Sequence, residues 1–188
     1  LILMLFFSLF IVLSIPQESR NLCLLLSSLS LPFILLYPSA KRWFKYPQLI
    51  LSICWGFSVL IPWAASESSI AGGITLLFCW LATIFWTFGF DTVYAMADEK
   101  DDKKIGLKSS AISLGDKSIN AVSLSYLLCC IFLGIAAMNA NLGLIFWAFW
   151  LISTFGMQRE IFILQNKQKG ITSSGKHFRN QVWIGSLI

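Results

Sequence analysis

The chain has 188 residues, of which 57% are hydrophobic and only 12% are charged. A soluble domain carries about 25% charged residues, so this composition excludes an ordinary soluble globular domain and predicts a surface that faces lipid. The formal charge of +5 is thinly spread, and no dense basic patch interleaved with aromatic residues lies outside the apolar runs. We therefore expect a lipid bilayer, and no nucleic acid, as a partner.

Apolar segments follow one another along the whole chain. They lie at 1–15, 22–38, 47–65, 70–90, 118–138 and 141–158, and another begins near residue 180. In lipid the backbone must satisfy its own hydrogen bonds, so each segment is expected to be a helix. The alternating pattern of a lipid-facing barrel is absent. The sequence thus predicts an all-α, polytopic transmembrane helix bundle that forms a single membrane domain over residues 1–188.

The two ends of the chain suggest a fragment. Residue 1 is Leu, and the first apolar run is shorter than the roughly 20 residues that span a bilayer. No basic region precedes this run and no small-residue cleavage site follows it, which argues against a signal peptide. Residues 182–188 resemble the opening of another span. We expect a piece of a longer protein, cut at both ends.

The basic residues predict the orientation in the membrane. Short connections near Pro16, Glu67 and Asn139 alternate with longer polar ones at 39–46, 91–117 and 159–179. If every segment spans, the longer connections share one side, and of the 14 lysines and arginines all but Arg20 lie there. The positive-inside rule makes that side cytoplasmic. We expect an integral protein of the cell's inner (plasma) membrane, or an equivalent one, with its active-site face cytoplasmic.

The cysteines and the single histidine offer little chemistry. All five cysteines lie in apolar runs without a CxxC pair, so we interpret them as buried packing residues rather than disulfide or metal partners. His177 lies in a polar stretch without Cys or Glu partners at metal-ligand spacing. We expect it in a loop or an interface, and no zinc site.

All the aspartates fall between Asp91 and Asp116, directly after the apolar run 70–90. Asp91, Asp98 and Asp102 are seven and then four residues apart, which places them on one helical face. Exposed like charges at such spacing repel by roughly 0.2–0.5 kcal/mol per pair, and a bound cation would relieve this repulsion. Asp98 and Asp102 form a DxxxD pair that suits Mg²⁺. The alternative is a solvated loop, because lysines and a glutamate intervene.

Two neighbouring features extend this hypothesis. Gly106 allows the helix to end, and Lys108 follows in a loop that could fold back over a bound anion. At 37–42, Pro38 is expected to interrupt a helix before Lys41 and Arg42, and an arginine there could bind a carboxylate or phosphate. The alternative is that Lys41, Arg42 and Lys45 only satisfy topology and anionic lipid.

Three stretches resemble a known family. The stretch from Asp91 to Gly115, DTVYAMADEKDDKKIGLKSSAISLG, closely resembles the second aspartate-rich motif of the UbiA-type membrane prenyltransferases. Together with YPSAKRWFKYPQL and NQVWIG, it looks most like 4-hydroxybenzoate polyprenyltransferases of ubiquinone or plastoquinone synthesis. The resemblance runs from partway through the family's third helix to the start of its ninth. It implies a nine-helix bundle with a cavity, in which Mg²⁺ holds a polyprenyl diphosphate beside an aromatic acid.

The resemblance also implies roles for individual residues. Asp98 and Asp102 would bind the metal with Asp101 as a helper, Asp91 and Tyr94 would line the same face, and Lys108 would partner the diphosphate. Lys41 and Arg42 resemble the basic pair near the acceptor or the diphosphate. The family's first motif, of the NDxxDxxxD type, does not occur, and no aspartate precedes Asp91. These residues alone would therefore be expected to be inactive.

Other functions remain open at this point. Chlorophyll synthases and homogentisate or menaquinone-type prenyltransferases share the scaffold. A transporter or channel would use the acidic face as a cation site, although transport sites usually lie near mid-membrane. A non-catalytic remnant would fit the missing first motif. The sequence of the stretch from Asp91 to Asp102, DTVYAMADEKDD, favours the hydroxybenzoate branch.

Overall fold

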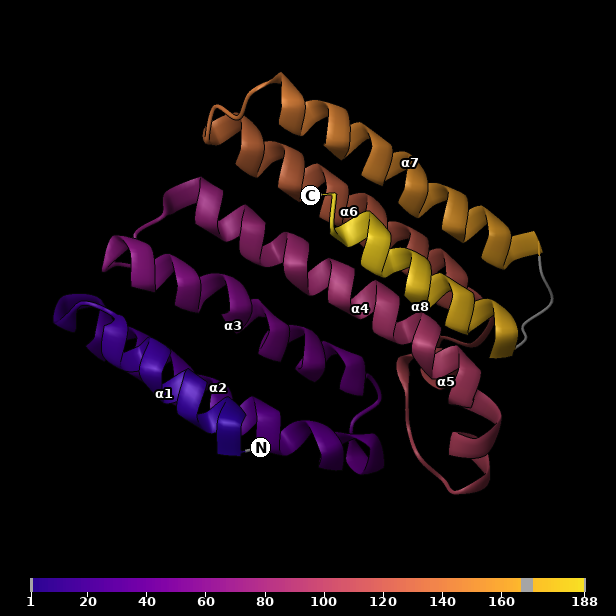
Figure 1. The fold of residues 1–188 in the computed structure, drawn as a ribbon. Helices are drawn as coiled ribbons and strands as arrows, with labels where there is room; N and C mark the ends of the chain where they lie inside the picture. Colours follow the sequence, from indigo (N-terminus) through magenta and orange to yellow (C-terminus); the bar gives the residue numbers. More distant parts are fainter. Residues whose placement is uncertain (1, 167–170, 188) are drawn as a thin grey trace.

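The computed structural model describes residues 2–166 and 171–187, and within these ranges every regular element is a helix (Figure 1). The long helices are α2, α3, α4, α6 and α7, and the shorter ones are α1, α5, η1 and α8. Their bounds are α1 Ile2–Ser14, α2 Gln17–Trp43, α3 Pro47–Glu67, α4 Gly73–Lys104, α5 Ser110–Leu114, η1 Gly115–Lys117, α6 Ser118–Asn139, α7 Leu144–Asn166 and α8 Ile171–Gly185.

The helix α4 lies at the centre of the bundle. It packs between α3 and α6, while α2 flanks α3 and α7 flanks α6 (Figure 1). The C-terminal helix α8 returns to pack against both α4 and α7. Short turns join α2 to α3, α3 to α4 and α6 to α7, whereas residues 105–117, with α5 and η1, join α4 to α6. The prediction of an all-α bundle with short connections near residues 16, 67 and 139 is confirmed.

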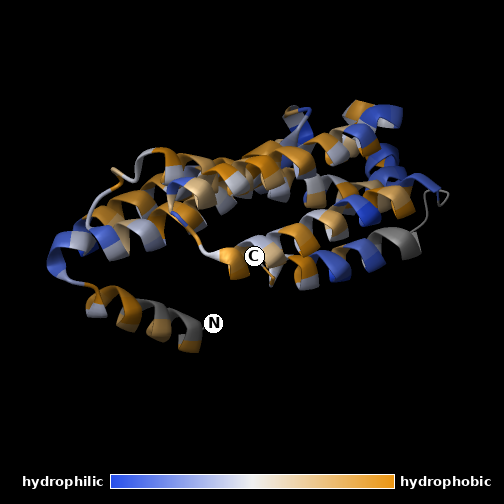
Figure 2. Cartoon of the chain, turned by 90° about the horizontal axis from the view of Figure 1, so that it is seen from above, coloured by the Kyte–Doolittle hydropathy of each residue, from blue (hydrophilic) through white to orange (hydrophobic). Residues whose placement is uncertain are grey.

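Four helical segments are long and apolar enough to cross a membrane: Gln17–Trp43, Pro47–Glu67, Gly73–Lys104 and Ser110–Asn139. Hydrophobic colouring covers much of these helices and hydrophilic colouring gathers toward their ends (Figure 2). Large apolar side chains such as Leu35, Trp55 and Leu127 are exposed along them, as expected of side chains in contact with lipid. The helices α1, α7 and α8 do not meet the same criteria of length and hydropathy.

Two helices extend further than the apolar runs suggested. Pro38 does not interrupt α2, which continues to Trp43. An interior proline removes one backbone hydrogen bond and crowds the carbonyl four residues earlier, but α2 tolerates this and ends with the Phe44 N–H donating to the Ala40 carbonyl. Likewise α4 continues past Phe90 to Lys104, because residues 91–104 contain neither Gly nor Pro and include strong helix formers. The acidic residues therefore extend a helix rather than opening a loop.

The region around His177 also differs from the prediction. The helix α8 begins at Ile171 rather than near residue 180, and His177 lies inside it with 1% of its surface exposed. The His177 ring contacts the Tyr126 hydroxyl through Nε2 at 2.8 Å, and Nδ1 lies 3.7 Å from Glu160. Burial lowers the pKa of His177 to about 4. The loop assignment was wrong, and the interface assignment is confirmed.

The cysteines behave as the sequence predicts. All five are free, with Cys23, Cys129 and Cys130 buried and the other two half-buried. Cys130 belongs to the main core, in which side chains of α4, α6 and α7 meet around Tyr126 and Met157. The cysteines act as small apolar packing residues.

A close helix contact at Gly89 permits the packing of α4 on α6. A Cβ at Gly89 would lie 2.6 Å from Cε1 of the buried Tyr126 ring. We expect Gly89→Ala to destabilise the bundle by about 1–3 kcal/mol, as for other overpacked cores. The measurement is the thermal midpoint in detergent. The matched control is Gly175→Ala in α8, where nothing lies within 4 Å and alanine should be neutral or stabilising. Equal midpoints for the two variants would contradict this view of the contact.

Candidate active site at the C-terminal end of α4

Three carboxylates share α4, as their spacing predicted. Asp91 and Asp102 are buried, with 9% and 6% of their surfaces exposed, and Asp98 is half-buried between them. Burial of carboxylates is costly without partners. Partners come from α2, where Tyr37 Oη lies 3.5 Å from Asp91 Oδ2 and Lys41 Nζ lies 3.5 Å from Asp102 Oδ2. This burial excludes a wholly solvated acidic loop.

The helix α2 presents Tyr37 and Lys41 together because residues four apart share a helical face. Tyr37 was not among the site residues expected from the sequence, which missed its contact with Asp91. The signal that could have found it is this four-residue spacing from Lys41. The two contacts are long, so they indicate alignment of the groups more than strong bonding.

The remaining charges on α4 behave as a solvated face. The Asp101 side chain is 79% exposed and pairs with Lys104 at 2.7 Å, and Lys103 pairs with Glu99 at 2.7 Å. Such exposed helix pairs contribute only a few tenths of a kcal/mol. The structure thus separates Asp101 from Asp91 and Asp102. The alternative of a solvated, mixed-charge segment therefore describes only this outer face of α4.

The loop at 105–109 folds back onto the end of α2. Gly106 adopts a positive φ of 73°, as a residue at a helix end commonly does. The Lys108 N–H donates to the Lys41 carbonyl at 2.7 Å, and its Nζ donates to the Trp43 carbonyl at 3.0 Å. A cation is favourable at a helix C-terminus. Lys108 therefore lies beside Lys41, but its ammonium is bound to α2 rather than to a carboxylate.

Two further predicted residues lie at the edge of the cluster. Arg42 is exposed at the end of α2. Tyr94 is 53% exposed and faces α8, where its ring lies 6.2 Å from that of Phe178. Phe178 also packs 5.3 Å from the Phe90 ring. The structure therefore brings together Asp91, Asp98, Asp102 and Lys41 with Tyr37. Tyr94 lies on the same helix but faces α8, and Arg42 follows Lys41 as an exposed residue with no contact shown to the cluster.

The carboxylates fit one kind of metal site. Within the part of the chain that the structure describes, no group of three or more His, Cys, Asp or Glu residues is placed to hold an ion. Mg²⁺, however, typically takes one or two carboxylates and completes its shell with water and substrate phosphate. Asp98 and Asp102, one turn apart, offer that donor set. The charge partner that the structure shows for Asp102 is the ammonium of Lys41.

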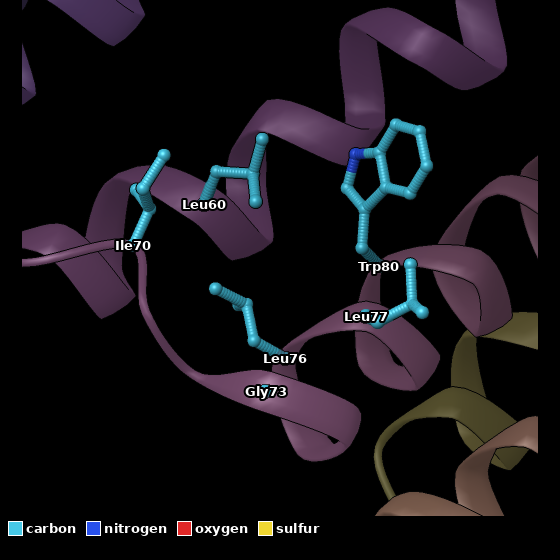
Figure 3. Close-up of a pocket in the computed structure, with 6 residues that line it drawn as sticks. All are labelled: Leu60, Ile70, Gly73, Leu76, Leu77 and Trp80. Atoms are coloured by element: carbon cyan, nitrogen blue, oxygen red, sulfur yellow. The ribbon is translucent and has the colours of Figure 1, made fainter.

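A separate pocket of about 200 Å³ lies at the other end of α4. It is lined by residues of α3, of α4 and of the segment between them: Leu60, Ile70, Gly73, Leu76, Leu77 and Trp80 (Figure 3). At 1.5 Å per residue, Trp80 is roughly 27 Å along the helix from Asp98. None of the residues that line this pocket is charged, so the pocket offers no charged group for chemistry.

Comparison with known proteins agrees with the motif resemblance. The model of the UbiA prenyltransferase family matches residues 1–180. A 4-hydroxybenzoate solanesyltransferase of Synechocystis sp. is 40% identical over 162 residues, which cover 85% of this chain and 54% of that protein. A 4-hydroxybenzoate octaprenyltransferase of Francisella tularensis subsp. novicida is 34% identical over 165 residues, which cover 88% of this chain and 57% of that protein.

The chain thus spans a little over half the length of these relatives. No solved structure matches it. The family match nevertheless covers almost every described helix, including the carboxylate end of α4. This chain belongs to the UbiA prenyltransferase family.

Proposed function

We propose that the protein transfers a polyprenyl group from a polyprenyl diphosphate to an aromatic acceptor, 4-hydroxybenzoate, in ubiquinone or plastoquinone biosynthesis, and that it does so with Mg²⁺. The observation that carries the proposal is the buried carboxylate end of α4 facing a lysine of α2. The relatives support the choice of acceptor, since both are named for 4-hydroxybenzoate.

The groups of this end suit a diphosphate. Asp98 and Asp102 would hold Mg²⁺, which supplies positive charge against the negative charge that grows on the departing diphosphate. Lys41, whose side chain is 28% exposed beside Asp102, would contact the same phosphates. Lys108 lies next to Lys41 and would reach them by releasing the Trp43 carbonyl. Positive charge would thus surround the leaving group on two sides.

Once the charge of the diphosphate is neutralised, prenyl transfer proceeds in two steps. The allylic C–O bond breaks and its electron pair leaves with the diphosphate. A ring carbon ortho to the phenol hydroxyl attacks the allylic cation, a C–C bond forms, and the ring releases its proton. Phe90 and Tyr94 flank Asp91 along α4, and their rings pack with that of Phe178 from α8. Aromatic faces of this kind would suit a transient cation.

The exposed Arg42 gives the acceptor a binding partner. A guanidinium binds a carboxylate bidentately, and so would fix the orientation of the benzoate ring. We expect Arg42→Ala to raise the KM for 4-hydroxybenzoate about tenfold or more and to leave the KM for the diphosphate nearly unchanged. The matched control is Lys45→Ala, which removes an exposed cation of the same segment. An unchanged KM for the acid would assign Arg42 to membrane topology instead.

Product analysis tests the function as a whole. Membranes that contain the full-length protein, with these residues as part of it, would be supplied with a polyprenyl diphosphate, Mg²⁺ and either 4-hydroxybenzoate or homogentisate, and the products identified by mass. We expect the prenylated hydroxybenzoate to dominate. Prenylated homogentisate as the main product would keep the reaction and change the acceptor. Absence of any prenylated product would favour a transporter or a non-catalytic membrane protein.

A further inference from the structure

A buried polar residue outside the charged cluster bonds the start of α5, directly after the loop at 105–109. Gln48 lies in the first turn of α3 with 1% of its surface exposed. Its Oε1 accepts the backbone N–H of Ser110 at 2.7 Å. Ser110 is the first residue of α5, so this bond satisfies one of the N–H groups that a helix start leaves unpaired.

Ser110 connects Gln48 to α4. Its hydroxyl and that of Thr92 lie 2.8 Å apart, and neither residue has any measurable exposure. Thr92 directly follows Asp91 in the chain. The amide of Gln48 therefore joins α3, the start of α5 and the carboxylate end of α4 in one buried network.

The same loop is bound to the residues around Lys41. The Lys108 N–H donates to the Lys41 carbonyl, and the Ser113 hydroxyl donates to the Lys45 carbonyl, each at 2.7 Å. These two bonds join the loop and α5 to the end of α2 and to the segment that follows it. Lys41 in turn places its ammonium 3.5 Å from Asp102. The loop is thus bonded directly to the residue whose ammonium faces Asp102.

We propose that Gln48 is a positioning residue of the diphosphate site: by holding the start of α5 it keeps the 105–109 loop on α2, and so keeps Lys41 and Lys108 beside Asp102. Gln48 itself touches neither the carboxylates nor the two ammonium groups through any bond that the structure shows. The role in catalysis rests on the function proposed above. The role in holding the loop does not.

The test compares Gln48→Leu with Gln48→Glu. Leucine has similar volume but accepts no hydrogen bond, whereas glutamate keeps an acceptor oxygen in the same place. For Gln48→Leu we expect the KM for the polyprenyl diphosphate to rise about tenfold, with the KM for 4-hydroxybenzoate nearly unchanged, and Gln48→Glu to restore much of the loss. The matched control is Ser52→Ala, one turn further along α3, because buried Ser52 donates only to the Gln48 carbonyl of its own helix.

A second readout does not depend on activity. Trypsin cleaves after lysine, and Lys103, Lys104 and Lys108 flank or occupy the loop. In detergent, we expect faster cleavage there in Gln48→Leu than in the unaltered protein, Gln48→Glu or Ser52→Ala. Unchanged cleavage in Gln48→Leu would overturn the proposal, and so would equal rises in both KM values without rescue by Gln48→Glu. If the unaltered protein transferred no prenyl group, the proposed function and the catalytic role would fail together, while cleavage would still decide whether Gln48 holds the loop.

Discussion

Asp98→Asn and Asp102→Asn should each reduce prenyl transfer at least about 100-fold. Asparagine keeps the shape of the side chain but removes the negative charge that Mg²⁺ requires, and the loss of one charge-stabilising group at a reacting centre typically costs 10²–10³ in kcat. Asp102→Asn also leaves Lys41 without its anionic partner. Because the two carboxylates would act on one ion, the double variant should be little worse than either single one.

Asp101→Asn provides the control for this prediction. Asp101 lies on the same turn of α4, but its side chain is 79% exposed and bound to Lys104. We expect its activity to stay within about twofold of the unaltered protein, since an exposed pair of this kind contributes little. The measurement is the initial rate per amount of protein inserted in the membrane. Full activity in Asp98→Asn and Asp102→Asn would remove the metal assignment, and a large loss in Asp101→Asn would restore the helper role that the family resemblance implies.

Removal of divalent cations should abolish the reaction and should do so reversibly. A diphosphate leaving group carries several negative charges, and the ammonium groups of Lys41 and Lys108 cannot neutralise them alone. We expect a chelator to reduce the rate more than about 100-fold and added Mg²⁺ to restore it. Ca²⁺ should restore less, because it prefers more ligands at longer distances than two carboxylates and a diphosphate offer.

A variant with a weakened metal site should need a higher Mg²⁺ concentration to react, which complements the chelator experiment. In Asp98→Asn, the Mg²⁺ concentration for half-maximal rate should rise well above that of the unaltered protein, while in Asp101→Asn it should not change. A rate that is insensitive to the chelator would show that the carboxylates of α4 serve another purpose, such as binding a lysine in a structural role.

The sequence predicted much of this site because helical spacing is a local property. Asp91, Asp98 and Asp102 share α4 as their seven- and four-residue separations required. The apolar run 70–90 before them predicted that they lie at the end of a helix. Gly106 follows the end of α4, as expected. The all-α bundle followed from the lengths of the apolar runs and from the need of the backbone in lipid to bond internally.

What the sequence could not supply were contacts between helices. The partner of Asp91 is Tyr37 on α2, 54 residues earlier in the chain, and only packing brings the two together. The family motif gave no reason to separate Asp101 from Asp102, yet adjacent residues point about 100° apart on a helix and only one of them faces α2.

Burial and polarity misled the sequence interpretation elsewhere. His177 was assigned to a loop because its neighbours are polar, but the segment is helical: Lys176 and Arg179 are exposed, whereas the His177 ring is buried against Tyr126. Pro38 was expected to interrupt a helix, yet α2 continues through it to Trp43. For His177 a local preference was outweighed by packing that a single sequence does not display.

The most direct test of the account is whether this end of α4 holds a metal together with a diphosphate. Mn²⁺ can replace Mg²⁺ as a paramagnetic probe, and a non-reacting thiolo analogue of the polyprenyl diphosphate can replace the substrate. The measurement is the magnetic coupling between bound Mn²⁺ and the phosphorus nuclei. The account predicts coupling in the unaltered protein and in Asp101→Asn, and its loss in the double variant Asp98→Asn, Asp102→Asn. The same coupling in that double variant would contradict the account, because the metal and its diphosphate would then be held without the carboxylate face of α4.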